Sequence, residues 1–204
     1  MVVMKNVNHI EKYLKEIKFI CDTISREDID KAIELLFDAW KNDNQVFLCG
    51  NGGSAGTATH FMCDLFKVTI VEDKKRFKCY CLNDNIPLMS ALINDNGFDN
   101  LFIEQLKNLY RKGDVLICLS VHGGSGQDKA GLWSQNLLKA MDYVNKNDGK
   151  TIGFAGFDGG AMKKLANVCV VVPFNATPHV EAFQVVLQHL IAFRLKEKIM
   201  TNQD

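Results

Sequence analysis

Residues 45–54 read Gln45-Val46-Phe47-Leu48-Cys49-Gly50-Asn51-Gly52-Gly53-Ser54. The apolar run at the start has the length of a buried strand, and the glycines after it are typical of a tight turn. A helical pattern follows, so the segment predicts a strand, a turn and the start of a helix. The free N–H groups and the dipole at such a helix start suit an anion such as phosphate. A purely structural turn is the alternative, because every doubly wound sheet needs tight turns.

The same pattern recurs along the chain. Apolar runs at 114–119 and 151–155 lead into the turns Ser120-Val121-His122-Gly123-Gly124-Ser125 and Gly156-Phe157-Asp158-Gly159-Gly160, and two further strands are predicted at 168–172 and 77–82. Continuous apolar strands that alternate with helices indicate a parallel sheet with helices on both faces. We therefore predict one α/β domain over residues 1–204, with a doubly wound parallel sheet and a ligand site at the carboxyl ends of its strands.

Both ends of the chain are predicted to be helical. The first 44 residues contain two amphipathic patterns, and the last helix, from Thr177 to about Ile199, is apolar around most of its surface. We expect this last helix to be buried on most sides. The exceptions to its apolar character are Glu181, Gln184, Gln188 and His189. The apolar surface of these terminal helices exceeds what one small domain covers, which predicts a homo-oligomer, most simply a tetramer.

Composition excludes several classes of protein. The 204 residues carry a formal net charge of +0, so no overall field favours nucleic acid or an acidic membrane surface. The first 16 residues become charged too soon for a secretory signal, and no apolar run could span a bilayer, so we expect a cytoplasmic protein. The seven cysteines include no C-x-x-C pair and are predicted to be structural thiols. Neither G-x-G-x-x-G nor a P-loop is present, so no nucleotide cofactor is expected.

Four segments resemble one family in the same order along the chain. Residues 50–55, followed by His60, are similar to the G-N-G-G-S-A…H segment of the phosphoheptose isomerases and their sugar-isomerase (SIS) relatives. Residues 92–98 and the turns that begin at Ser120 and Gly156 resemble three further segments, and the last helix takes the place of the family's active-site helix. The resemblance implies an SIS-type fold, a homotetramer, and conversion of sedoheptulose 7-phosphate into a heptose 7-phosphate.

Three positions depart from the family pattern. Asp64 stands where the family has its catalytic glutamate, Glu181 where it has a glutamine, and His122 within a turn that carries hydroxyl groups in the family. An apparent insertion, 126–135, follows that turn. Two functions therefore stay open: a sugar-phosphate isomerase, and a non-catalytic SIS module that binds a sugar phosphate or a protein partner. Another reaction on a phosphosugar is a third reading.

The predicted site combines metal-binding and acid–base groups. His60 and Asp64 are four residues apart and share a helix face, while Glu181 and His189 are about 80° apart around their helix. Two imidazoles and two carboxylates match zinc or another divalent metal, and a hydrogen-bonded network without metal is the equal alternative. We expect Asp64 and His189 to be the catalytic pair of an aldose–ketose isomerisation. The predicted substrate-binding residues are Asn51, Gly52, Gly53, Ser54, Asn94, Asp95, Ser120, His122, Ser125 and Glu181.

Overall fold

A computed structural model describes residues 6–124 and 134–202. Its five strands form one parallel sheet in the order β2-β1-β3-β4-β5. The strands are β1 (Gln45–Gly50), β2 (Lys78–Cys81), β3 (Val115–Leu119), β4 (Lys150–Ala155) and β5 (Val168–Val171). The chain passes from β1 outward to β2 and then crosses to β3 on the other side of β1. The crevice between the carboxyl ends of β1 and β3 is therefore the switch point of the sheet.

Helices cover both faces of the sheet, as predicted. The elements are α1 (Asn6–Thr23), α2 (Arg26–Lys41), α3 (Gly53–Lys67), α4 (Ile86–Asn96), the 3-10 turn η1 (Phe98–Asn100), α5 (Leu101–Leu109), α6 (Gln135–Lys146), α7 (Met162–Leu165) and α8 (Thr177–Thr201). Side chains from α2, α3 and α8 pack on one face, and those from α5, α6 and α7 pack on the other. Alternate residues of β1 supply the two cores, with Val46 and Leu48 on the first face and Phe47 and Cys49 on the second. The predicted doubly wound α/β fold is confirmed.

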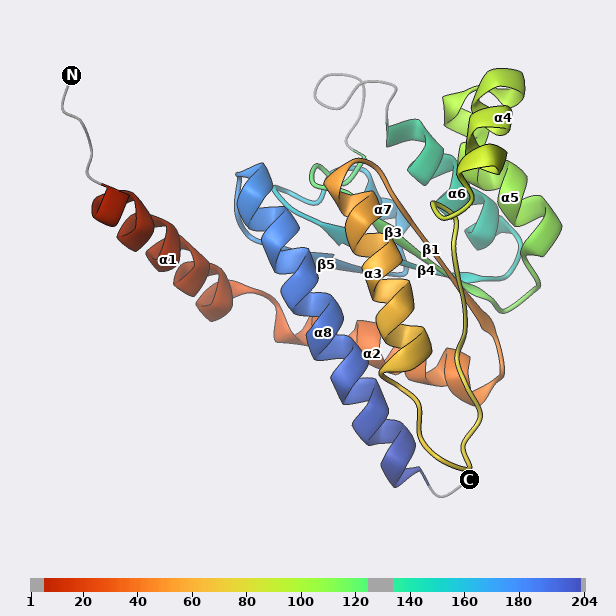
Figure 1. The fold of residues 1–204 in the computed structure, drawn as a ribbon, viewed down its shortest axis with the longest axis horizontal. Helices are drawn as coiled ribbons and strands as arrows, with labels where there is room; N and C mark the ends of the chain where they lie inside the picture. The colour runs from red at the N-terminus through yellow and green to blue at the C-terminus, as the bar shows by residue number, and fades with distance from the viewer. Residues whose placement is uncertain (1–5, 125–133, 203–204) are drawn as a thin grey trace.

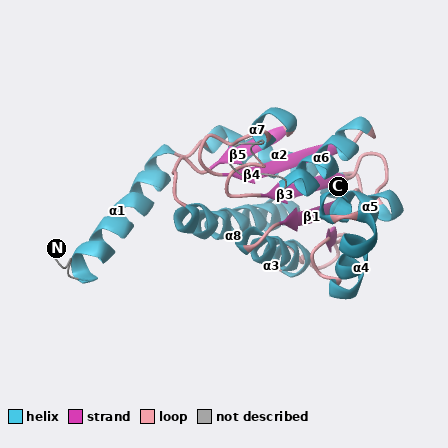
Figure 2. Cartoon of the chain, turned by 90° about the horizontal axis from the view of Figure 1, so that it is seen from above, coloured by secondary structure: helices cyan, strands magenta, loops and turns pink. Residues whose placement is uncertain are grey.

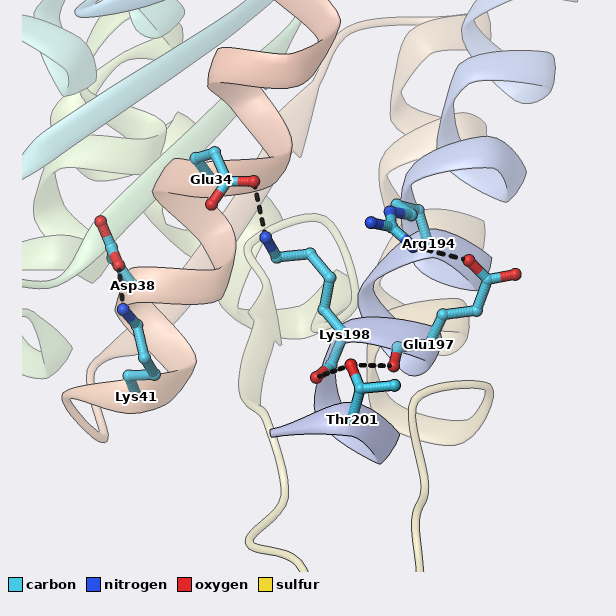
Figure 3. Close-up of polar contacts among 7 residues, drawn as sticks. All are labelled: Glu34, Asp38, Lys41, Arg194, Glu197, Lys198 and Thr201. Carbon is cyan, nitrogen blue, oxygen red and sulfur yellow. Dashed lines mark hydrogen bonds and ion pairs between the residues drawn. The ribbon is translucent and has the colours of Figure 1, made fainter. Parts of the chain in front are cut away.

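Helices α3 and α8 lie side by side along one face of the sheet (Figures 1 and 2). Both begin at the carboxyl edge of the sheet and run toward the opposite edge, so their contact forms a long seam. The far end of α8 is tied to α2 by an ion pair between Lys198 Nζ and Glu34 Oε1, 2.6 Å apart (Figure 3). In the last turn of α8, Thr201 Oγ1 donates to the carbonyl of Glu197 at 3.1 Å. The far end of α8 is thus fixed against α2.

Helix α1 projects away from the rest of the chain (Figure 1). Only Ile20 of this helix is buried. Its other anchor is His179 in the first turn of α8, whose ring lies between Tyr13 and Phe174 at centroid distances of 4.3 and 4.5 Å. His179 Nε2 lies 3.0 Å from Glu16 Oε2. A few contacts near one end therefore hold a helix that leaves most of its apolar side chains in solvent.

The expectation that α8 is buried on most sides is wrong for the isolated chain. Val186, Leu190 and Phe193 are 49%, 45% and 57% exposed. They are exposed because the sheet, α2 and α3 cover only the inner half of the helix, and nothing in the described chain covers the outer half. The helix therefore carries more apolar surface than packing within the chain buries. Among the described residues, no helix is both long and apolar enough to cross a membrane.

The seven cysteines are all free thiols, and their burial divides them into two groups. Cys21 and Cys63 are exposed, whereas the other five are buried or half-buried. Burial raises the pKa of Cys81 and of Cys169 to about 12. Because the thiolate is the reactive form, these side chains are chemically inert near neutral pH.

We predict that a thiol-specific disulfide reagent at pH 8 modifies two cysteines rapidly and the other five only after unfolding. The reason is that a pKa of about 12 keeps the Cys81 and Cys169 thiols protonated at this pH. Absorbance of the released chromophore counts the modified thiols. A Cys21→Ser, Cys63→Ser double variant serves as the control and should show no rapid phase. More than two rapid thiols in the wild type would contradict the burial described here.

Candidate functional site

The first glycine turn joins β1 to α3 in a backbone conformation that requires glycine. Gly52 caps α3 with φ of 57°, in the region where a side chain is strained. The next residue, Gly53, lies against Glu181 of α8, since a Cβ atom built on Gly53 would come within 2.4 Å of the Glu181 carboxylate. The N–H groups of Gly53 and Ser54, in the first turn of α3, have no partner within the helix. The turn therefore combines the expected anion-binding geometry with a carboxylate beside it.

The hydroxyl of Ser54 is part of a buried brace between α3 and α8. Its Oγ donates to Gln184 Oε1 at 3.0 Å, and the two residues are each 1% exposed. Gln184 Nε2 in turn donates to the carbonyls of Ser120 and Phe154 at 3.4 and 3.3 Å. One amide thus connects both glycine turns to the last helix. This places the Ser54 side chain in the framework of the turn, so that only its backbone N–H is left to meet a ligand.

Two asparagines also fix the first turn, and the sequence analysis did not single them out. Asn83, just after β2, accepts from the N–H of Gly50 at 3.0 Å and donates to its carbonyl at 3.1 Å. Asn136 of α6, fully buried, exchanges two amide hydrogen bonds with Asn51 at 3.0 and 2.9 Å. The predicted ligand Asn51 is therefore held in place from α6. The sequence offered only one signal for these two residues, which is that Asn83 lies just after a strand and Asn136 at the start of a helix.

The second glycine turn, after β3, is closed by its own serine. Ser120 Oγ accepts from the N–H of Gly124 at 3.2 Å. The ring of His122 contacts that of Phe157 from the third turn, with centroids 4.3 Å apart. His122 and Ser120 therefore lie at the carboxyl edge, as predicted. Ser125 and most of the insertion lie outside the described residues.

Three of the four predicted metal ligands come together on the seam between α3 and α8. Ligand atoms of His60, Asp64 and His189 all lie within 4.8 Å of one another. His189 Nδ1 is 3.0 Å from Asp64 Oδ2, and His60 Nε2 is 3.8 Å from Asp64 Oδ1. The two imidazoles are about half exposed, with side-chain values of 46% and 45%, whereas the Asp64 side chain is 9% exposed. A buried carboxylate thus stands behind two accessible imidazoles.

Gln188 orients this carboxylate from the core side. The residue is fully buried, and its Nε2 donates to Asp64 Oδ2 at 3.2 Å. The same oxygen lies close to His189, so Asp64 is held by α8 at two successive residues. Gln188 was noticed in the sequence as a polar exception on an apolar helix, but its role was not predicted. Gln188 and Gln184, both buried, therefore point inward from α8 toward α3.

Glu181 does not join this cluster, and the expectation that all four residues converge is corrected. Glu181 and His189 are eight residues apart, which is about 12 Å along the helix axis at 1.5 Å per residue. The angle around the helix places both residues on nearby faces but does not reveal this displacement along the axis. The structure instead sets Glu181 beside Gly53, at the first glycine turn.

The predicted ligands Asn94 and Asp95 are exposed in the described chain. Asn94 Nδ2 donates to Asp95 Oδ1 at 2.7 Å, and both lie on α4. This helix has no buried residue and packs mainly against η1 and α5, away from α3 and α8. The isolated chain therefore does not bring these two residues to the seam, and their role in substrate binding stays a prediction.

A cavity of about 620 Å³ lies at the opposite, amino edge of the sheet. Its lining includes Asp30 and Glu34 of α2 and the first residues of β3, β4 and β5. None of the residues predicted from the sequence line it. Ligand sites in parallel sheets lie at the carboxyl ends of the strands, so we place the candidate site at the glycine turns and the seam.

Comparison with known proteins identifies the family of the chain. Residues 12–156 match the family model of the SIS domain. The chain belongs to the SIS domain family. Over 197 residues it is 33% identical to a phosphoheptose isomerase from Nitratiruptor sp., which covers 94% of this chain and 98% of that protein. It is 39% identical over 162 residues to the lincomycin biosynthesis protein LmbN from Streptomyces lincolnensis, covering 78% of this chain and only 58% of that protein.

A solved structure supports the same grouping. The phosphoheptose isomerase GmhA from Neisseria gonorrhoeae superimposes with a TM-score of 0.81 at 25% identity, covering 94% of this chain and 96% of that chain. The predicted resemblance to the SIS family and its phosphoheptose isomerases is therefore confirmed.

We predict that Gln184→Leu lowers the free energy of unfolding by about 1–3 kcal/mol, because it leaves the buried Ser54 hydroxyl without its acceptor. Adding Ser54→Ala should recover part of this loss, since the unpaired hydroxyl is then removed as well. Urea unfolding followed by circular dichroism measures both effects. Gln135→Leu on α6 is the matched control and should change stability little. Strict additivity of Gln184→Leu and Ser54→Ala would contradict the brace.

Proposed function

We propose that this protein is a sugar-phosphate aldose–ketose isomerase that acts on a seven-carbon substrate, interconverting sedoheptulose 7-phosphate and a heptose 7-phosphate. The carrying observation is the cluster of His60, Asp64 and His189 on the seam below a glycine turn suited to phosphate. The relatives named phosphoheptose isomerase support this activity.

The reaction moves a proton between neighbouring carbons of the sugar. A base removes the C1 proton of the ketose, an enediolate forms, and the proton returns to C2 while the hydroxyl proton passes from O1 to O2. Asp64 is the proposed base, because its carboxylate is buried and oriented by Gln188. His189, 3.0 Å from Asp64, is the proposed shuttle for the hydroxyl proton.

A divalent metal fits the same cluster. Two nitrogen ligands and one carboxylate, with a further position open, are the donor set of catalytic zinc sites. Ligand atoms around one tetrahedral zinc lie about 3.3 Å apart, so the spacing here, within 4.8 Å, needs only small adjustments. A bound metal would polarise the substrate oxygen on which negative charge develops. We propose His60, Asp64 and His189 as its ligands and no longer include Glu181.

The separation of the two parts of the site favours a long substrate. Gly53 and His60 are seven residues apart on α3, which is about 10 Å along the helix axis. A phosphate at the glycine turn and a reacting carbon at the imidazoles therefore require an extended sugar phosphate. This supports a seven-carbon substrate over shorter ones.

We predict that Asp64→Asn reduces isomerase turnover by about 10²–10⁴-fold, because the amide keeps the shape of the carboxylate but not its basicity. Substrate affinity should stay within about threefold, since the phosphate is bound elsewhere. Turnover is followed by chromatographic separation of ketose and aldose phosphates, and affinity by calorimetry. Asp142→Asn on α6 is the control. Full activity of Asp64→Asn would show that Asp64 is not the catalytic base. Binding without turnover in the wild type would favour the non-catalytic module.

The metal has its own test. His60→Gln and His189→Gln should each lower the zinc content of the purified protein, measured by elemental analysis, whereas Glu181→Gln should not. Wild-type protein stripped by a chelator should lose activity and regain it with zinc. Full turnover in metal-free protein would instead favour the hydrogen-bonded network.

We further propose that the protein acts as a homo-oligomer, most simply a tetramer, whose contacts complete the site. The half-exposed imidazoles of His60 and His189 lie on the same outer side of the seam as exposed Val186 and Leu190. Phe193 and the apolar side chains of α1 extend this uncovered surface. A second copy of the chain is the occupant that would cover it and exclude water from the reacting groups. The cytoplasmic location stays a prediction.

Light scattering at micromolar concentration should therefore give a mass near four chains. Phe193→Glu should lower this mass, because it places a charge in the apolar contact, and it should lower activity with it. Met200→Glu, an equally exposed position at the end of the same helix, is the control. A monomeric wild type would contradict both the proposed oligomer and the proposal that a second chain completes the site.

A further inference from the structure

Two asparagine–glycine pairs occur in the sequence, Asn51-Gly52 and Asn96-Gly97. An asparagine before glycine is prone to spontaneous deamidation, because glycine has no Cβ atom to shield its backbone nitrogen. This nitrogen attacks the side-chain amide carbon, a new C–N bond closes a succinimide ring, and ammonia leaves. Water then opens the ring to aspartate or isoaspartate. The reaction needs no oxidant or cofactor, and it converts a neutral side chain into a carboxylate.

The first pair lies at the candidate site, and its side-chain amide is held through both polar atoms. Asn51 Oδ1 accepts from Asn136 Nδ2 at 2.9 Å, and Asn51 Nδ2 donates to Asn136 Oδ1 at 3.0 Å. Asn136 is fully buried, and its Oδ1 also accepts from the N–H of Leu137 at 2.9 Å. An attack by Gly52 N requires the Asn51 amide to leave this position. That movement would break two hydrogen bonds and leave a buried amide unpaired.

The second pair has much weaker support. Asn96 is the last residue of α4, and Gly97, with φ of 80°, is its C-cap. Both residues are exposed, and α4 has no buried residue. The carbonyl of Asn96 accepts from Asn100 Nδ2 at 2.7 Å, but its side chain has no hydrogen bond among the described residues. Gly97 N is held only by a bond of 3.2 Å to the carbonyl of Ile93. An exposed helix end of this kind opens locally at little cost in free energy.

We propose that Asn96 is a site of spontaneous deamidation and that Asn136 protects Asn51 from the same reaction. The two pairs have the same chemistry, so the difference between them comes from the fold. Deamidation of Asn51 would add a negative charge to the turn before α3, and isoaspartate would add a backbone atom beside Gly52, whose φ of 57° that turn requires. At Asn96 the new charge would lie at the C-terminus of α4, where the helix dipole opposes it and the last turn loosens. Both effects are independent of the proposed isomerase activity.

Peptide mass spectrometry of the full-length protein, kept folded at 37 °C and pH 8, follows asparagine, aspartate and isoaspartate at both positions. Asn96 should convert about tenfold faster than Asn51, which corresponds to about 1.4 kcal/mol and lies within the cost of leaving a buried amide unpaired. In urea the two rates should become similar, because unfolding removes the contact with Asn136. Asn96→Gln is the control and should show no conversion at this position.

A variant of the protecting residue tests the cause. Asn136→Ala should accelerate the conversion of Asn51 about tenfold and leave that of Asn96 unchanged. The matched control is Asn145→Ala on the same helix, which loses hydrogen bonds to Leu165 and Thr151 but leaves the contact with Asn51 intact. It should lower the melting temperature without accelerating Asn51.

Three results would overturn the proposal. One is an equal rate at Asn51 and Asn96 in the folded wild type, and another is an Asn96 that stays intact while the unfolded protein converts. The third is an equal acceleration of Asn51 in the Asn136→Ala and Asn145→Ala variants, since it would indicate a general loss of stability. The comparison of folded with unfolded wild type decides the first two even where a variant fails to fold.

Discussion

The buried polar contacts between α3 and α8 are the constraint on which the rest of this structure depends. Two glutamines on α8, Gln184 and Gln188, face α3 from within an apolar core and bind Ser54 and Asp64. An amide left unpaired at this depth costs free energy, so these contacts fix the rotation and the axial position of α8 against α3. Apolar packing alone would tolerate a slide or a rotation along the seam, whereas the Gln184 amide, bonded through both its oxygen and its nitrogen, does not. Both the glycine turn and the imidazole cluster are positioned through this register.

The fold was readable from the sequence because its signals are local. Three of the strands, β1, β3 and β4, are continuous apolar runs that lead into a glycine turn, so their boundaries and the carboxyl edge follow from neighbouring residues. The pairing of His60 with Asp64 was predictable for the same reason, since both lie on one face of α3. The contact between Asp64 and His189 joins two different helices, so spacing along one helix does not predict it. The resemblance to the family, which places an active-site helix at the end of the chain, indicated this contact.

Two features could not be predicted from the sequence. One is the position of a side chain along a helix axis, and the other is the identity of hydrogen-bond partners that are distant in the chain. Glu181 was assigned to the wrong cluster because a helical projection shows angles and hides a displacement of about 12 Å. Asn83 and Asn136 were missed because their partners in the first turn lie more than 30 residues away in the chain. The exposed side of α8 was misjudged because apolar composition does not distinguish a side chain buried in the core of the chain from one that stays exposed on its surface.

The corrected position of Glu181 changes how the altered residues of this chain are understood together. Its carboxylate lies beside Gly53, where the N-terminal dipole of α3 stabilises negative charge. A carboxylate accepts hydrogen bonds from hydroxyl groups, so we expect Glu181 to meet a sugar hydroxyl rather than phosphate oxygens. His122 lies elsewhere on the same edge, in the turn after β3, where its ring contacts that of Phe157. The glutamate at 181 and the histidine at 122 therefore alter two separate points of the carboxyl edge, one after β1 and one after β3.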